Sequence, residues 1–184
     1  MNTVVDALES DAQSPLIENP WAFATRPSRS ELFARGRAMR KECPRGSHAD
    51  WTAPPDRPDP VRLVEEANDG RIPELVPLRH GRMLASPFTF YRGTALNMAV
   101  DLAGTRTTGL RVQACGDAHL GNFRCFATPE RRVIFDIHDL DETLPAPWEW
   151  DVKRLAVSFV VACRANGFGD KRARLGQNGL RNSR

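Results

Sequence analysis

Two short polar segments carry most of the chemistry that this sequence offers. The first, CGDAHLGNF at 115–123, holds Asp117, His119 and Asn122 between and beside two glycines. The second, DIHDLDE at 136–142, holds three aspartates and a glutamate directly after a hydrophobic run. Carboxylates this close together repel one another when they are desolvated, so a positive group has to balance them.

Two kinds of partner could supply that charge. Magnesium binds carboxylate and amide oxygens and keeps several water ligands, which suits both segments. The structural alternative is that the carboxylates are solvated or pair with nearby basic residues, namely Arg131, Arg132, Lys153 and Arg154. We favour the metal, because the acidic cluster follows a strand of buried character and lies near a second polar loop.

The spacing of the acidic and amide residues has a known use in phosphoryl transfer. An aspartate orients or deprotonates the acceptor hydroxyl, while an asparagine five residues later and a further aspartate hold magnesium on the nucleotide phosphates. The transferred group needs positioning and charge neutralisation more than covalent help. The pattern therefore suggests a phosphoryl-transfer site.

Hydrophobic spacing indicates the elements that must position these segments. We expect strands over 86–93 and 109–115, where apolar and polar residues alternate, and over 131–140, where a hydrophobic run leads into polar residues. A proline-rich loop is expected over 43–60. Capping and stop residues predict four helices, over 28–42 with Ser28 or Ser30 as the cap, 59–70 with Asp59 as the cap, 94–104 and 150–167. The first helix would have an apolar side of Leu32, Phe33 and Met39, and the last a face of Val152, Leu155, Ala156, Phe159, Ala162 and Cys163.

Composition narrows the class of protein. The chain has 184 residues and a net charge of +3 from 26 basic and 23 acidic residues, a balance too even to demand nucleic acid as a partner. The four cysteines form no C-x-x-C pair, which argues against zinc and favours reduced thiols in the cytoplasm. Neither a signal peptide nor a membrane span is expected.

The motifs resemble those of a known superfamily. GDAHLGN is similar to the catalytic loop GD-x-H-x-x-N of the aminoglycoside phosphotransferase and choline kinase branch of the protein-kinase-like fold. VIFD resembles the strand and metal-binding aspartate that follow there, and the 14 residues between Asn122 and Asp136 suit a short hairpin. PAPWEWDVKRLA resembles the later segment whose second aspartate begins a helix and braces the catalytic loop.

A longer resemblance covers about residues 31–167. Three segments, RHGRMLASPFTFYRGTALNMAVDLA, VQACGDAHLGNF and VIFDIHDLDETLPAPWEWDVKRLAVS, resemble in order the uncharacterised bacterial family catalogued as domain of unknown function 2252. The two resemblances together imply an α+β fold, a partial protein-kinase-like fold with a small antiparallel sheet, a catalytic-loop hairpin and flanking helices.

The kinase-like resemblance implies a role for each matching residue. Asp117 would be the catalytic base, with His119 either catalytic or bracing the loop. Asn122 would bind the metal together with Asp136 or, alternatively, Asp139; Asp141 lies just beyond. Asp151 would brace the loop, with Arg154 in support.

The chain also departs from the kinase-like pattern. The only lysine before Asp117 is Lys41, so Arg82 or Arg92 would have to supply the cation for the nucleotide phosphates; Arg92 could equally be a surface or ion-pair residue. Cys115 stands where many phosphotransferases have histidine. We expect a flexible arm over 1–28, the family domain over 29–168 and a basic, disordered tail over 169–184, with the chain truncated at its C-terminal end.

The function that these features imply is a phosphotransferase dependent on Mg²⁺ and ATP, cytoplasmic and acting on a small-molecule acceptor, without nucleic acid or a membrane as partner. A metal-dependent phosphoesterase is an alternative, since Asp136 and His138 form a D-x-H element. That element comes in the reversed order, however, and the chain has only four histidines. A further alternative is a non-catalytic fragment or binding module, inactive as a truncated chain.

Overall fold

The structure is a computed structural model, and it describes residues 27–169. The predicted arm and tail therefore lie almost wholly outside the described residues. The described part is α+β, as predicted, with six α-helices and two antiparallel sheets of two strands each. Its α-helices are α2 (Arg29–Glu42), α3 (Pro60–Glu66), α4 (Val76–Met83), α5 (Pro87–Arg92), α6 (Ala95–Ala103) and α7 (Trp148–Ala165). Its strands are β1 (Arg111–Ala114), β2 (Phe123–Ala127), β3 (Val133–Ile137) and β4 (Leu144–Pro147), and its 3-10 turns are η1 (Arg45–Ala49), η2 (Pro73–Leu75) and η3 (Leu120–Asn122).

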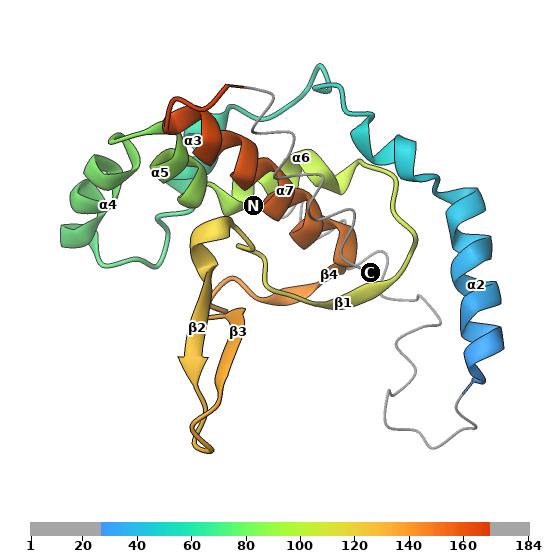
Figure 1. Ribbon diagram of the computed structural model, residues 1–184. Coiled ribbons are helices and arrows are strands. Elements are labelled where there is room, and N and C mark those ends of the chain that lie inside the picture. The colour runs from blue at the N-terminus through green and yellow to red at the C-terminus, as the bar shows by residue number, and fades with distance from the viewer. Residues whose placement is uncertain (1–26, 170–184) are drawn as a thin grey trace.

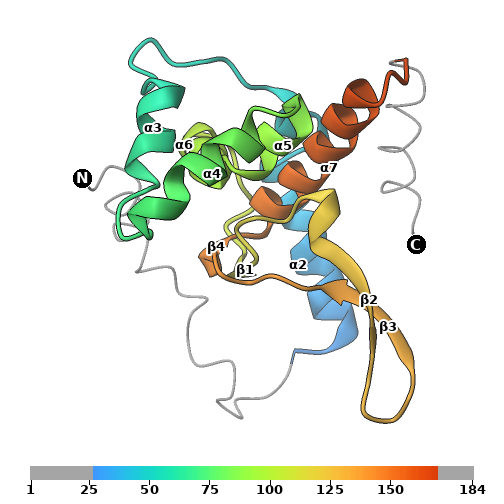
Figure 2. The same cartoon turned by 90° about the vertical axis from the view of Figure 1, so that its left-hand side faces the viewer.

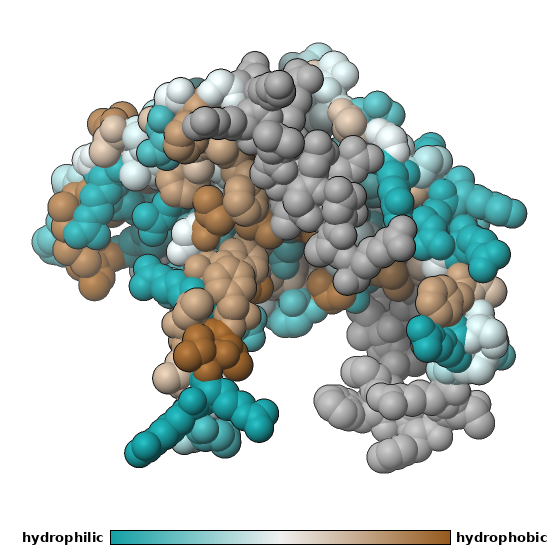
Figure 3. Space-filling view, in the orientation of Figure 1, coloured by the Kyte–Doolittle hydropathy of each residue, from teal (hydrophilic) through white to brown (hydrophobic). Residues whose placement is uncertain are grey.

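The two sheets have different surroundings. Strands β1 and β4 pair beneath α6 and α7, and the core between them consists of Leu102, Ala114, Ala146 and Trp150. Strands β2 and β3 form a hairpin that extends from the body (Figure 1). None of the hairpin's strand residues is buried, and Figure 3 shows apolar side chains on its surface near the body. Helices α4, α5 and α6 lie together beside α7 (Figure 2).

The predicted strand over 86–93 is wrong, because this segment forms α5. Ser86 caps the helix and forms a capping box with Thr89, and Pro87 occupies the first turn, where its missing N–H costs nothing. The alternation of Phe88 and Phe90 is too short to outweigh these start signals.

Helices α2 and α3 begin where their capping residues predict, but the predicted apolar side of α2 is not buried. Helix α2 begins after Ser28 with a capping box to Glu31, but it buries none of its residues, so the predicted apolar side is not packed among the described residues. Helix α3 begins after Asp59 as predicted and ends at Glu66, short of Gly70. The segment 43–59 is a loop apart from η1, and Pro60 already begins α3.

The buried face of α7 only partly matches the predicted one, with which it shares Ala162. Its buried side chains are Glu149, Trp150, Arg154, Ser158 and Ala162, whereas Val152 is 48% exposed. The most deeply buried line of the helix is thus partly polar, which is stable only where each polar group has a partner. The partners of Arg154 and Ser158 lie in the loop that carries Asp117, whereas Glu149 accepts hydrogen bonds from Thr108.

Candidate functional site

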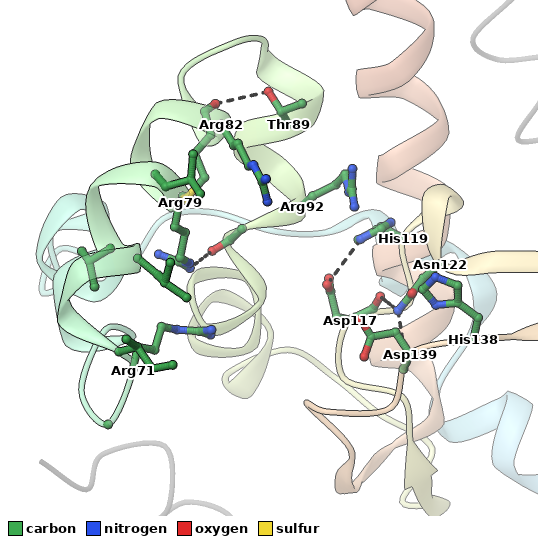
Figure 4. Close-up of a pocket in the computed structure, with 17 residues that line it drawn as sticks. Arg71, Arg79, Arg82, Thr89, Arg92, Asp117, His119, Asn122, His138 and Asp139 are labelled. Carbon is green, nitrogen blue, oxygen red and sulfur yellow. Dashed lines mark hydrogen bonds and ion pairs between the residues drawn. The ribbon is translucent and has the colours of Figure 1, made fainter.

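A cavity of about 660 Å³ lies between helices α4 and α5 and the two polar loops (Figure 4). One wall consists of residues from the loops that follow β1 and β3, and the other of residues from η2, α4 and α5. Of the predicted site residues, Asp117, His119, Asn122, Asp139, Arg82 and Arg92 line the cavity.

Asp117 is held by a buried arginine from α7. Arg154 is 2% exposed, and its Nε donates to Oδ1 of Asp117 at 2.7 Å, while its Nη2 contacts the same oxygen. Nη2 also donates to the carbonyl oxygen of Tyr91 at 3.0 Å. The guanidinium lies over the Tyr91 ring, 4.6 Å from its centroid. The Asp117 carboxylate is therefore held in position by the buried guanidinium of Arg154.

Tyr91 completes this network from α5. Its hydroxyl donates to the carbonyl oxygen of Arg154 at 2.8 Å. The side chain of each residue therefore donates to the backbone carbonyl of the other. Burial raises the pKa of Tyr91 to about 12. The tyrosine is thus a neutral donor that joins α5 to α7 directly beneath the candidate site.

Helix α7 also binds the backbone of the Asp117 loop. The Asp151 carboxylate accepts hydrogen bonds from the backbone N–H groups of Cys115 at 2.7 Å and Gly116 at 3.1 Å. The Ser158 hydroxyl accepts one from the backbone N–H of Leu120 at 2.9 Å. Burial raises the pKa of the Cys115 thiol, which keeps that group neutral within the loop.

The two polar loops touch one another at their backbones. Gly116 has a φ of +78°, and a Cβ atom there would lie 2.0 Å from the carbonyl oxygen of Glu142, so only glycine fits. Asn122, 3% exposed, donates from Nδ2 to the carbonyl oxygens of Asp117 and Asp139, both at 3.1 Å. One amide thereby joins the two loops, and within residues 27–169 its Oδ1 accepts no hydrogen bond and is available to a ligand.

The structure separates the two aspartates that the sequence left as alternatives. Asp139 lines the cavity beside Asn122. Asp136 lies on β3, opposite Arg124 of the hairpin, and its Oδ1 accepts a hydrogen bond from the backbone N–H of Ile137. Asp136 is not among the residues that line the cavity.

His119 lies at the junction of the loop and α5. It is 4% exposed, its Nε2 is 3.4 Å from Oδ2 of Asp117, and its ring meets the edge of Phe88. Its Nδ1 is buried and has no hydrogen-bond partner among the described residues.

The opposite wall is basic. Arg71, Arg79, Arg82 and Arg92 line it. Arg71 pairs with Glu142 at 3.5 Å, and Arg79 donates to two neutral oxygens, those of the Asn68 side chain and the Gly93 backbone. Burial, and then repulsion from Arg71, lower the pKa of Arg79. Within the described part of the chain, the side chains of Arg82 and Arg92 make no hydrogen bond or ion pair, so this wall carries uncompensated positive charge.

Three residues of this network were missed by the sequence interpretation: Tyr91, Ser158 and Arg79. All three lie within the segments that resemble the family, but their roles follow only from contacts with other parts of the chain, to which no motif points. Within residues 27–169, no group of three or more histidine, cysteine, aspartate or glutamate side chains is arranged to hold a metal ion. No helix in the same range is long and apolar enough to cross a membrane.

The sequence model of one protein family, described as an uncharacterized protein conserved in bacteria (DUF2252), matches residues 71–175. This is more than half of the chain, and the protein belongs to that family, as its motifs predicted. No curated protein and no solved structure matches the chain.

Proposed function

We propose that the cavity is the active site of a phosphotransferase that uses Mg²⁺ and ATP and acts on a small molecule. The observation that carries this proposal is the meeting of Asp117, Asn122 and Asp139 on one wall, across from arginines that have no carboxylate partner. Phosphoryl transfer needs these two features, oxygen ligands for a hard cation and positive charge for the phosphates.

The donor groups fit magnesium. Mg²⁺ is commonly bound by one or two protein ligands together with substrate phosphates and several waters. Asp139 offers a carboxylate, and Asn122 offers Oδ1, because its Nδ2 is already used to join the loops. When bound, Mg²⁺ would neutralise charge on the phosphates; Asp139 is the aspartate for this role, since Asp136 lies outside the cavity.

The charges of the cavity also fit the magnesium complex of a nucleoside triphosphate. Arg79, Arg82 and Arg92 contribute three positive charges, and Asp139 contributes one negative charge; Asp117 is balanced by Arg154. The net charge of this set is therefore +2, and Mg–ATP carries about two negative charges. Arg82 and Arg92 take the place of the missing strand lysine as the phosphate-binding cations.

Asp117 is the residue positioned to receive the acceptor hydroxyl. Arg154 and His119 contact its two oxygens and hold the carboxylate at the cavity wall. Asp151 and Ser158 fix the loop backbone on either side of it. This bracing supports the resemblance to kinase-like phosphotransferases, in which an aspartate at the start of a helix does the same.

The test is magnesium-dependent binding of ATP by calorimetry. We expect Asp139→Asn to weaken binding at least about tenfold, as the loss of a charge-assisted contact of about 1.5–3 kcal/mol implies. The matched control Asp136→Asn, on the exposed hairpin, should bind as the wild type does. Equal effects of the two substitutions, or no magnesium-dependent binding by the wild type, would refute the proposal.

A further inference from the structure

A second cavity, of about 1060 Å³, lies among α5, α6, α7 and the segment 48–60. Thr89 and Arg92 of α5 line the first cavity, whereas Phe90 and Tyr91 line the second, so the two cavities flank this helix. The volume is just above the range of about 300–1,000 Å³ that is usual for small-molecule sites. The second cavity is therefore large enough for a ligand of its own.

The walls of this second cavity are mainly apolar. Large apolar side chains line it from α4, α5 and α7, namely Met83, Leu84, Phe90, Val157 and Val161. Leu84 is 81% exposed, and Phe90 and Val157 are exposed as well. Apolar side chains gathered around a hollow and left exposed to water are typical of a site that binds an apolar group.

One charged group of the cavity lacks an oppositely charged partner within residues 27–169. Among the lysine, arginine and acidic residues that line it, Arg57 and Asp101 form an ion pair with two hydrogen bonds. Lys153 makes no ion pair, and its Nζ donates only to the Thr105 hydroxyl, at 3.0 Å. An ammonium group has three N–H donors, so two remain for a ligand.

Glu149 does not satisfy this lysine. It attracts Lys153 from the same helix, but it does not line the cavity, and its Oε1 accepts hydrogen bonds from the backbone N–H and the hydroxyl of Thr108. Burial lowers the pKa of Lys153, while the attraction of Glu149 raises it. An anion in the cavity would offset the cost of holding this charge away from water.

The cation stands at one end of an apolar line on α7. Lys153, Val157 and Val161 follow one another at intervals of four residues, so they lie along the same side of the helix. This line spans about 12 Å, at about 1.5 Å per residue. It offers a positive charge followed by apolar surface, which complements a ligand with an anionic head and an apolar chain.

From this arrangement we propose that the second cavity binds an aliphatic monocarboxylate, with the carboxylate on Lys153 and the chain against the apolar walls. The single unpaired positive charge matches a monoanion. A phosphate monoester carries about two negative charges and would leave one of them uncompensated. The site goes beyond the proposed function, because it needs neither a nucleotide nor a metal ion.

The test is calorimetric binding of decanoate and of decanol to the full chain, both below the concentration at which they aggregate. We expect the wild type to bind decanoate about tenfold or more tighter than decanol, since only decanoate forms a charge-assisted hydrogen bond. Lys153→Met should bind the two probes alike, and the control Lys41→Met, on the exposed side of α2, should behave as the wild type does. Equal affinity of the wild type for both probes, or an unchanged preference in Lys153→Met, overturns the proposal.

A second pair of variants tests the apolar walls. Because Leu84 is so exposed, Leu84→Ser should keep the thermal stability of the wild type and bind both probes several-fold more weakly. Leu32→Ser, at an exposed position of α2 outside the cavity, should have no effect. If both variants lose affinity equally, binding is non-specific and the proposal fails. A wild-type dimer that Leu84→Ser dissociates, without binding of decanoate, would assign this surface to a second copy of the chain and also overturn the proposal.

Discussion

Replacing Arg154 by methionine removes the buried cation beneath Asp117 while keeping a long apolar side chain. Breaking a buried ion pair on one side costs about 3–5 kcal/mol, because the remaining charge is left uncompensated. The Asp117 side chain is 18% exposed and can gain some water from the cavity, so the lower end of that range applies. The lost hydrogen bond to the Tyr91 carbonyl adds about 1 kcal/mol. We expect Arg154→Met to lower the free energy of unfolding by about 3–4 kcal/mol.

The assay is urea unfolding followed by circular dichroism, with the pair of Arg57 and Asp101 as the control. Arg57 makes two hydrogen bonds to Asp101, but these side chains are 30% and 21% exposed, so Arg57→Met should cost only about 1 kcal/mol. Asp117→Asn combined with Arg154→Met should cost about 2 kcal/mol less than the sum of the single substitutions. The reasoning fails if Arg154→Met costs no more than Arg57→Met, or if the two site substitutions are simply additive.

Two further predictions concern the loop and its support. Gly116→Ala should destabilise the protein by more than about 3 kcal/mol, since the added carbon meets the Glu142 carbonyl; Gly109→Ala, also at positive φ but in open space, should cost about 1 kcal/mol in the same urea assay. Tyr91 is the chain's one tyrosine, so its ionisation can be followed directly by ultraviolet absorbance, with an expected midpoint near pH 12 in the folded protein and near the ordinary 10.0 in urea. Because the folded-state pKa is the higher one, the stability from Tyr91 is complete below pH 10.0 and is lost as the pH rises through about 12; coincident titrations in the two states would contradict this.

Elements with strong local start signals could be predicted from the sequence. Ser28 and Asp59 cap helices as expected, because a capping side chain acts on backbone groups two or three residues away. Alternation over 86–93 gave the wrong element, since the Ser86 cap and Pro87 favour a helix at the same positions. Strand β4 was not predicted, because its two prolines, Pro145 and Pro147, argue against a strand unless it has a free edge.

The candidate site, too, could be predicted from the sequence only in part. Asp117 and Asn122 could be selected by spacing alone. The two polar loops meet although the strands that precede them, β1 and β3, belong to different sheets. The choice between Asp136 and Asp139 depended on where β3 ends, which hydrophobic pattern fixes only to within a few residues. Arg154 was among the basic residues expected to pair with the carboxylates, and it pairs with Asp117. Periodicity alone would not place an arginine on the buried line of α7, where an apolar residue is the usual occupant.

The bonds from α7 to the loop around Asp117 also bear on how this protein folds. Asp151, Arg154 and Ser158 contact groups 35 to 38 residues earlier in the chain, so the loop cannot reach its final shape until the helix has packed. Closing a segment of this length lowers the conformational entropy of the chain before any of these hydrogen bonds has formed. We therefore expect the site to assemble late on the folding pathway. The conformation of this loop should therefore report on completion of folding, and hydrogen exchange at Cys115 and Leu120 should occur only through global unfolding.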